Sequence, residues 1–388
     1  MKSILSIIII FLAHTFQMLH AKIPTLSEKA QISVLTCSSG DELFSSFGHT
    51  AFRVQDPVLG IDIVYNYGTF DFNKPNFYLN FAKGKLIYSL SRKSFEAFLY
   101  DYQLEKRWIK EQLLDLNQEQ TNQLLKFFEE NYKPENRDYP YDPLFNNCST
   151  ITGDILEQQL GKSIKFNGSH LKELLTFRQL VHQHIKTNKW GTFGIDLAFG
   201  GITDREATVR QHMFLPYYAM HQLNNTTYNG KPILSRERTI SNYPEKSDQS
   251  TFMLSPLFWF SLLLAFVIAI TYLDKKHHGR SRFLDFVLFF ISGLAGLFIL
   301  LLWLATNHVV TQLNFNFLWL LPFNLIVSFY LLSKKKLPNW LSKYLWVALG
   351  LIIIMLVIWI FRIQVLSWLN LILMLVLTIR YLFLLKKI

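Results

Sequence analysis

The segment NNCSTITGDILEQQLG, residues 146–161, carries the strongest signal for both the fold and the chemistry of this chain. Asparagine is a favoured cap at helix starts and glycine often ends helices, so the pattern predicts a helix that begins near Cys148 and ends at Gly161. A cysteine in the first helical turn lies at the positive end of the helix dipole, which favours its thiolate. Cys148 is therefore a candidate nucleophile, although a buried structural cysteine would give the same pattern.

A base for this thiol is expected from a hairpin earlier in the chain. The segments HTAFRVQ (49–55) and IDIVYNYG (61–68) alternate apolar and polar residues, and DPVLG (56–60) between them predicts a turn. His49 begins the first strand directly after a glycine, where an imidazole can protrude from the edge of the sheet. A lone strand histidine more often has a structural role, but the presence of Cys148 favours His49 as the base.

A third polar group normally orients the imidazole of such a pair. The hairpin brings residue 49 opposite residue 66 or 67, so Asn66 is the first candidate and Tyr67 the second. Three residues close in sequence to these groups are candidates for binding substrate: Tyr67, Asn147 and Arg53. A histidine on a strand with a cysteine at a helix start is the papain-like dyad, here with the histidine first, as in circularly permuted members of that class.

The rest of this region predicts an α+β domain. Further strands are expected at 30–37 and 85–91, and helices at 94–108 and 117–132, the second opening on an Asn117 cap. A proline-rich loop, 133–147, delivers the chain to Cys148. The predicted fold class is thus an α+β, papain-like, circularly permuted domain outside the cytoplasm.

The N-terminus predicts export. Lys2 precedes the apolar run ILSIIIIFLA (4–13) and small residues follow, so residues 1–21 are expected to be a secretory signal peptide. The alternative is a retained signal anchor, and either places the next segment outside the cytoplasm.

The second half of the chain predicts a membrane domain. Five apolar runs, each about long enough to cross a bilayer as a helix, lie near 252–273, 283–305, 315–332, 344–361 and 365–385. We therefore expect an exported domain at 22–250 and an all-α domain with five transmembrane helices at 251–388. Arg380, inside the last run, is expected to snorkel to the membrane surface.

Basic residues give this domain an orientation and locate the net charge of +11. The breaks at 275–282 and 334–336 and the terminal pair 386–387 are rich in Lys and Arg, which places them and the C-terminus in the cytoplasm. Residues 251–388 hold 12 Lys or Arg and 2 Asp or Glu, so the exported domain is nearly neutral. A near-neutral domain is a poor binder of nucleic acid, and that class is excluded.

Three further features of the exported domain have alternative interpretations. The chain has two cysteines, so a Cys37–Cys148 disulfide is an alternative to a catalytic thiol in an oxidising compartment. His182 and His184 stand two apart with no accompanying acidic ligands, and Asp204 with its neighbours is either a charge pair or a head-group contact. We predict no metal and no dissociable cofactor.

Four blocks in order resemble the Lnb family of bacterial lipoprotein N-acyltransferases: TCSSGDELFSSFGHTAFRV (36–54), DIVYNYGTFDFNKPNFYLNFAKGKLIYSL (62–90), PENRDYPYDPLFNNCST (134–150) and FGIDLAFGGITDREATVRQHMFLPYYAM (193–220). The resemblance implies that His49 and Cys148 are the family's His and Cys. Arginines that usually follow the family's cysteine motif are replaced here by Ile151 and Gly153.

The resemblance also implies the reaction and its partners. A phospholipid of the inner membrane would donate an acyl chain through a thioester on Cys148, and the N-terminal amine of a lipidated lipoprotein would accept it. Phe- and Tyr-rich segments are expected to hold acyl chains or simply to pack in cores and interfaces. Two functions of other classes stay open: a papain-like hydrolase of cell-wall peptides, and a non-catalytic membrane sensor with a Cys37–Cys148 bridge.

Overall fold

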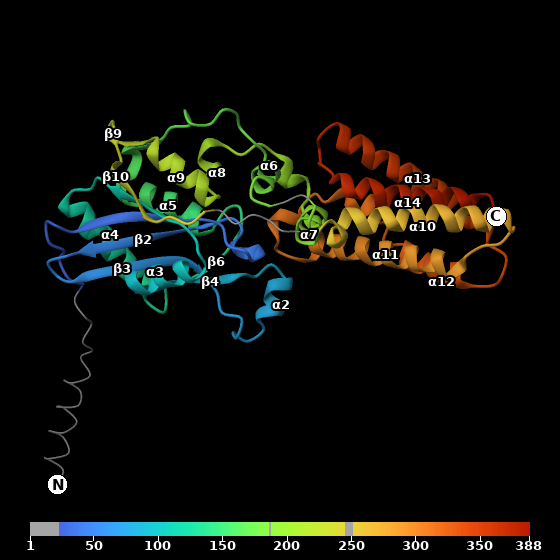
Figure 1. Ribbon diagram of the computed structural model, residues 1–388, viewed down its shortest axis with the longest axis horizontal. Helices are drawn as coiled ribbons and strands as arrows, with labels where there is room; N and C mark the ends of the chain where they lie inside the picture. The colour runs from blue at the N-terminus through green and yellow to red at the C-terminus, as the bar shows by residue number, and fades with distance from the viewer. Residues whose placement is uncertain (1–22, 186–187, 245–250) are drawn as a thin grey trace, which may run out of the picture.

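The computed structural model describes residues 23–185, 188–244 and 251–388 of the chain. The predicted signal peptide, residues 1–21, lies outside the described residues. An N-terminal α/β domain and a C-terminal group of long helices are joined end to end (Figure 1).

The α/β domain is built on a seven-stranded antiparallel sheet, in the order β10-β5-β1-β2-β3-β4-β6. Its strands are β1 (Gln31–Cys37), β2 (His49–Asp56), β3 (Ile61–Thr69), β4 (Ile87–Ser94), β5 (Ile109–Leu114), β6 (Asp138–Pro140) and β10 (Leu234–Ser241). The four strands expected from the sequence are β1 to β4, and their predicted positions are confirmed.

Strand β5 was not predicted because two polar residues are buried in it. Glu111 is 2% exposed and binds Arg53 and Arg238, while the Gln112 amide donates to the Met220 carbonyl at 3.0 Å. These partners satisfy the polar groups inside the sheet, which burial would otherwise penalise. A strand stabilised in this way does not alternate in hydropathy. The predicted helix, 94–108, was therefore extended up to the first residue of β5, although α3 ends at Leu104.

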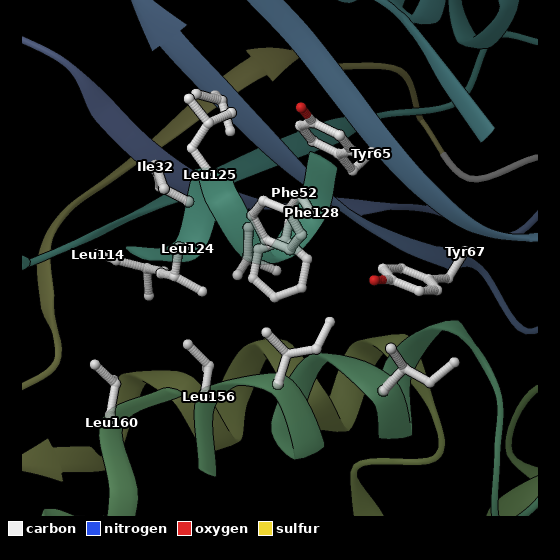
Figure 2. Packing of buried hydrophobic residues seen from close by; sticks show 14 of the residues in the cluster. Ile32, Phe52, Tyr65, Tyr67, Leu114, Leu124, Leu125, Phe128, Leu156 and Leu160 are labelled. Carbon is white, nitrogen blue, oxygen red and sulfur yellow. The ribbon is translucent and has the colours of Figure 1, made fainter. Parts of the chain in front are cut away.

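Two helices cover one face of the sheet, α4 (Gln118–Tyr132) and α5 (Cys148–Leu160), and α3 (Phe95–Leu104) lies against the other. Figure 2 shows Leu124 and Phe128 of α4 meeting Leu156 of α5 and Phe52 of the sheet. Burying such a side chain contributes about 1.5–3 kcal/mol. The predicted Asn117 and Asn147 caps are confirmed, both as capping boxes, and α5 ends at Gly161 as expected.

Shorter elements complete the domain beside the sheet. They are η1 (Leu43–Ser45), α2 (Phe77–Ala82), η2 (Gly161–Ser163), α6 (Phe177–His182), α7 (Trp190–Ala198), η3 (Gly201–Asp204), α8 (Val209–His212), α9 (Pro216–Asn224) and a small sheet of β7 (Ile164–Phe166), β8 (Thr226–Tyr228) and β9 (Lys231–Pro232). Arg178 joins α6 to η3 through Asp204 at 2.8 Å. Asp204 is therefore a buried charge partner and not a head-group contact.

Four helices of the C-terminal region are long and apolar enough to cross a membrane: α10 (Pro256–Lys276), α11 (Arg282–Ala305), α13 (Asn339–Ile360) and α14 (Trp368–Leu385). The third predicted span, 315–332, is instead a turn, η6 (Phe315–Leu318), followed by the nine-residue helix α12 (Asn324–Leu332). The five-helix prediction is thus not confirmed.

The break in this segment has local causes. Pro322 cannot donate a helical hydrogen bond. Buried Asn316 accepts from the Trp319 indole at 2.9 Å, and buried Asn324 donates to Tyr381 at 2.8 Å, so side chains take up polar contacts that a regular apolar span would lack. The segment nevertheless joins the two ends of the helical region, since Asn314 donates to carbonyls of α7 and Arg280 donates to the Leu331 carbonyl at 2.9 Å.

Arg380 does not snorkel to the surface, contrary to expectation. Its side chain is fully buried and pairs with Asp285 at 2.6 Å and Asp274 at 3.0 Å. These carboxylates belong to α11 and α10, so the guanidinium of α14 ties three membrane helices together. Removing one member would leave an uncompensated buried charge, the situation that makes intramembrane ionic groups costly.

Candidate active site

The helix start places the Cys148 thiol. Asn147 accepts through Oδ1 from the backbone N–H groups of Ser149 and Thr150, at 2.8 and 3.0 Å. Its Nδ2 donates to the carbonyls of Pro143 and Phe214, at 2.7 and 2.9 Å. The amide therefore fixes the first turn of α5 from both sides. Cys148, the next residue, is half-buried at the edge of the core.

A glycine permits His49 to begin β2 where it does. Gly48 has φ +83°, and a Cβ there would lie 2.7 Å from the carbonyl oxygen of Cys37 on the neighbouring strand. A side chain at this position would be strained by both its backbone and its surroundings. The chain therefore turns into β2 tightly against β1, opposite Cys37, and His49 emerges at the end of the strand.

Asn66 is the hydrogen-bond partner of the imidazole, through Oδ1 to His49 Nε2. Asn66 was the first candidate from the sequence, but the predicted pairing of residue 49 with residue 66 or 67 in the hairpin was wrong. Phe52 pairs with Tyr65 in the structure, which carried to the strand ends places His49 opposite Gly68. His49 and Asn66 are thus diagonal neighbours on one face, within reach of each other.

The thiol and the imidazole meet over Gly68. A Cβ on this glycine would lie 3.8 Å from both Cys148 Cβ and His49 Cε1. The two side chains are close enough for each to shift the pKa of the other, and since Asn66 occupies Nε2, His49 Nδ1 is the nitrogen left for the sulfur. The imidazole of His49 therefore lies between the Cys148 thiol and the Asn66 amide.

This contact shifts both protonation equilibria toward an ion pair. Burial raises the pKa of the Cys148 thiol, but the His49 charge and hydrogen bond, with hydrogen bonds to Thr50, outweigh it and lower that pKa to about 7. Burial lowers the pKa of His49, yet the Cys148 charge and the bonds to Cys148 and Asn66 leave it raised overall. The site therefore favours a thiolate beside an imidazolium near neutral pH.

Only part of the helix start is open to an incoming oxyanion. The N–H groups of Ser149 and Thr150 are already bound by the Asn147 cap. The Cys148 N–H has no acceptor among the described residues. At the helix start, the Cys148 N–H is therefore the group available to the oxyanion of a tetrahedral intermediate on the sulfur, at the positive end of the α5 dipole.

The triad opens into a cavity of about 460 Å³. Aromatic and aliphatic side chains make up most of its wall, including Phe44, Phe47, Phe70, Tyr88, Tyr141, Val181, Ile195, Phe199 and Phe214. Such a volume with apolar walls suits a hydrocarbon chain better than a polar peptide.

Arg107 contributes a guanidinium to this wall and was not among the residues predicted from the sequence. Its side chain is 6% exposed, donating through Nε to the Ser38 carbonyl at 2.6 Å and pairing through Nη1 with Glu105 at 3.0 Å. Its Nη2 is buried without a hydrogen-bond partner among the described residues. Arg107 lies two residues before β5, a strand that was not predicted because of its buried polar residues, so its place in the cavity wall follows only from the folded sheet.

Of the three predicted substrate-binding residues, two point away from the cavity. Tyr67 is 4% exposed in the core and its hydroxyl accepts from Asn131 at 2.7 Å. Arg53 is 4% exposed, held by Asp62 and Glu111 and stacked on Phe95. Asn147 does line the cavity, but its amide is fully used in capping α5. Tyr67 and Arg53 therefore support the fold around the site, and Asn147 is the one of the three that borders the cavity.

The cavity wall is also the junction with the membrane helices. Asn314 donates to the carbonyls of Leu197 and Ala198, at 2.9 and 3.0 Å, which caps the end of α7. Gly200 approaches the loop before η6 so closely that a Cβ on it would lie 1.8 Å from the Gln312 carbonyl oxygen. The segment that carries Ile195 and Phe199 into the cavity is therefore held by the helical region.

Two domains of one protein family are matched by the chain. The Lnb N-terminal periplasmic domain matches residues 25–183, and the Lnb transmembrane domain matches residues 247–388. The chain therefore belongs to the Lnb family, with a periplasmic N-terminal domain and a C-terminal membrane-spanning region. No curated protein and no solved structure matches it.

Proposed function

We propose that this protein is a lipoprotein N-acyltransferase that uses Cys148 as its nucleophile. The observation that carries the proposal is the alignment of Cys148, His49 and Asn66 at the end of an apolar cavity whose wall is fastened to membrane helices. The spatial order resembles a papain-like dyad with an orienting amide, and the chain order, histidine first, would make the fold a permuted form of that class.

In the first half-reaction the Cys148 thiolate attacks an ester carbonyl of a membrane phospholipid. The C–S bond forms, the ester C–O bond breaks, and the His49 imidazolium gives its proton to the departing lysophospholipid alkoxide. Arg107 supplies positive charge on the cavity wall for the donor's phosphate. The acyl chain remains on sulfur as a thioester.

In the second half-reaction the α-amine of a lipidated N-terminal cysteine attacks this thioester. His49, now neutral, accepts the proton that the amine loses, the C–N bond forms, and the C–S bond breaks to restore the thiolate and imidazolium. Asn66 keeps Nδ1 of the imidazole toward the sulfur throughout. The acceptor leaves as a triacylated lipoprotein, and no metal or dissociable cofactor takes part in these steps.

The location we propose follows from the basic breaks at 275–282, 334–336 and 386–387. They would lie on the cytoplasmic side of the inner membrane, with the C-terminus. The irregular segment through η6 and α12 would then be a fifth crossing, because it runs from the α7 contact of Asn314 to the Arg280 end of the helices. The periplasmic domain would extend from residue 22 to about 250, after a signal peptide at 1–21.

The two alternative functions are less well supported. A cysteine hydrolase would use the same triad with water as acceptor, but its peptide substrate does not explain an apolar cavity fastened to membrane helices. A sensor with a Cys37–Cys148 bridge is disfavoured because both cysteines are free in the structure.

The test is mass spectrometry of the full-length protein reconstituted with phospholipid and a diacylated lipoprotein. We expect a fatty acyl thioester on the peptide that contains Cys148, and acyl transfer to the lipoprotein amine when the acceptor is added. Cys148→Ala should abolish both products, and His49→Ala should lower both. Cys37→Ala is the matched control and should retain them.

Two results would contradict the proposal. An acyl group found on Cys37 or on no cysteine, while lipoprotein is still acylated, would remove Cys148 from the mechanism. A thioester that releases only free fatty acid in the presence of the acceptor amine would instead favour the hydrolase.

A further inference from the structure

Four large apolar side chains around α2 face solvent, and we call them the α2 patch: Phe72, Tyr78, Leu79 and Phe81. They are 52%, 72%, 52% and 49% exposed. No residue of α2 is buried, so the helix contributes nothing to a core of its own domain. A cluster of exposed apolar side chains of this kind marks an interaction surface.

The α2 patch is held where α11 leaves the membrane. The Lys83 carbonyl accepts from the backbone N–H of Asn307 at 2.9 Å. A Cβ on Gly84 would lie 2.6 Å from the backbone nitrogen of His308, so the two chain segments touch without a side chain between them. Residues 307 and 308 follow Ala305, the last residue of a membrane-length helix. Figure 1 shows α2 beside that end of the helices and off their common axis, where lipid would surround them.

A continuous series of aromatic rings leads from this contact to the cavity. The Phe81 ring lies 6.2 Å from the His308 ring and 6.3 Å from Phe77. Phe77 lies 6.2 Å from Phe70, and Phe70 lies 5.8 Å from Phe44. Phe70 and Phe44 line the cavity that contains Cys148. The rings thus connect the level of the membrane surface with the reacting thiol.

We propose that the α2 patch inserts into the outer leaflet of the membrane that the helices span, and that a lipid acyl chain reaches the cavity along Phe81, Phe77 and Phe70. The entry route rests on the acyl-transfer function proposed above, whereas insertion of the patch does not. Aromatic side chains favour the interfacial region of a bilayer. The exposed Lys83 and Lys85 beside the patch add attraction for anionic head groups.

Insertion is tested with a fluorescent reporter that needs no enzymatic activity. Tyr78→Cys in a Cys148→Ser background is labelled with nitrobenzoxadiazole, because the remaining Cys37 is 1% exposed and should not react. The full chain is reconstituted in phosphatidylcholine–phosphatidylglycerol vesicles with or without doxyl-labelled acyl chains. We expect blue-shifted emission from position 78 that the doxyl lipids quench severalfold and aqueous iodide does not.

Val58→Cys in the same background is the matched control. Its side chain is 60% exposed, at the turn between β2 and β3. Because β2 runs from His49 away from the cavity at about 3.3 Å per residue, this turn lies at the far end of the sheet. The label at 58 should be quenched by iodide and not by doxyl lipid. Equal behaviour at 78 and 58 would overturn the proposal, as would protection at 78 that disappears on dilution of the protein in lipid, which indicates a second copy as the occupant.

The entry route is tested separately with Leu79→Asp. Acyl transfer from vesicle phospholipid should fall severalfold, while alkylation of Cys148 by iodoacetamide keeps its wild-type rate. Unchanged transfer would overturn the route. If the wild-type protein transfers no acyl chain at all, the proposed function fails, and the quenching result still decides whether the patch inserts.

Discussion

The side-chain amide of Gln364, in the loop between α13 and α14, donates to the backbone carbonyl of Phe199 at 3.1 Å. The same side chain accepts from the Phe315 N–H at 2.6 Å and donates to Asn314. Phe199 lines the cavity with Cys148, so one buried glutamine connects two membrane loops to the wall of the candidate site. The position of the cavity wall relative to the helical region is thereby held by hydrogen bonds.

Gln364→Ala should loosen this junction. It leaves the Phe315 N–H and the Phe199 carbonyl without their partner, at a cost of about 1–3 kcal/mol for each buried group that stays unpaired. Hydrogen–deuterium exchange of the peptide 195–204 should become faster. Gln103→Ala, at an exposed glutamine of α3, is the control and should leave that peptide unchanged. Unaltered exchange in Gln364→Ala would show that the junction does not depend on this side chain.

The rate at which iodoacetamide alkylates Cys148 should rise with pH around a midpoint near 7. The ordinary thiol pKa of 9.0 is lowered to about 7, chiefly by His49 against the opposing effect of burial. Below the midpoint the thiol is protonated and reacts slowly, and above it the thiolate reacts. In His49→Ala the midpoint should move up, because the charge and hydrogen bond are lost while burial remains. A midpoint that stays near 7 in this variant would refute the ion pair.

Asn66→Ala should lower kcat with little change in KM. General acid–base catalysis by histidine is worth about 10²–10⁴-fold, and loss of the amide that orients the ring should remove up to about 10² of it. Asn66→Asp keeps an oxygen that accepts from Nε2 and should recover most of the rate. Steady-state transfer rates measure this. A purely structural role would instead be revealed by equal losses in both variants and a lower melting temperature.

Gly296→Ala should destabilise the membrane domain. A Cβ at Gly296 would lie 1.7 Å from the carbonyl oxygen of Leu320, so α11 could no longer pack against the irregular segment. Gly350 on α13 is the matched control, with nothing within 4 Å of an added Cβ. Alanine there should be neutral or stabilising by up to about 1 kcal/mol, because it is a better helix former. The melting temperatures of the two variants in detergent test this difference. A lower melting temperature in both variants would indicate a general effect of replacing helix glycines.

Local signals account for the parts of the site that the sequence could predict. The bounds of α5 are predicted by residue type alone, from the cap Asn147 before Cys148 and from Gly161 at its end. Alternation predicts the hairpin that carries His49. The register was off because the turn pairs Asp56 with Ile61 and leaves residues 57–60 as its loop, a choice that alternation alone does not determine. Arg107 was missed because its place in the cavity wall depends on β5, which was not predicted. The polar residues of β5 are paired with partners distant in the chain, such as Arg53 and Arg238.

The membrane half shows the same limit. Hydropathy measures how apolar a window is, and the window 315–332 is apolar enough to predict a regular span. It does not measure whether Asn316 and Asn324 find hydrogen-bond partners, or whether Gly293 and Gly296 let another segment approach α11 closely. The break therefore follows from tertiary contacts. Arg380 likewise appeared to be an interfacial cation because its partners, Asp274 and Asp285, lie about a hundred residues earlier.

The two thiols of the chain differ widely in acidity. Burial raises the pKa of Cys37 to about 12, and its side chain is 1% exposed behind His49, whereas Cys148 ionises near 7. At mildly alkaline pH a folded molecule should thus consume one equivalent of a small alkylating reagent, and a denatured molecule two. Counting equivalents gives the fraction of intact molecules in a purified sample before any lipid substrate has been identified.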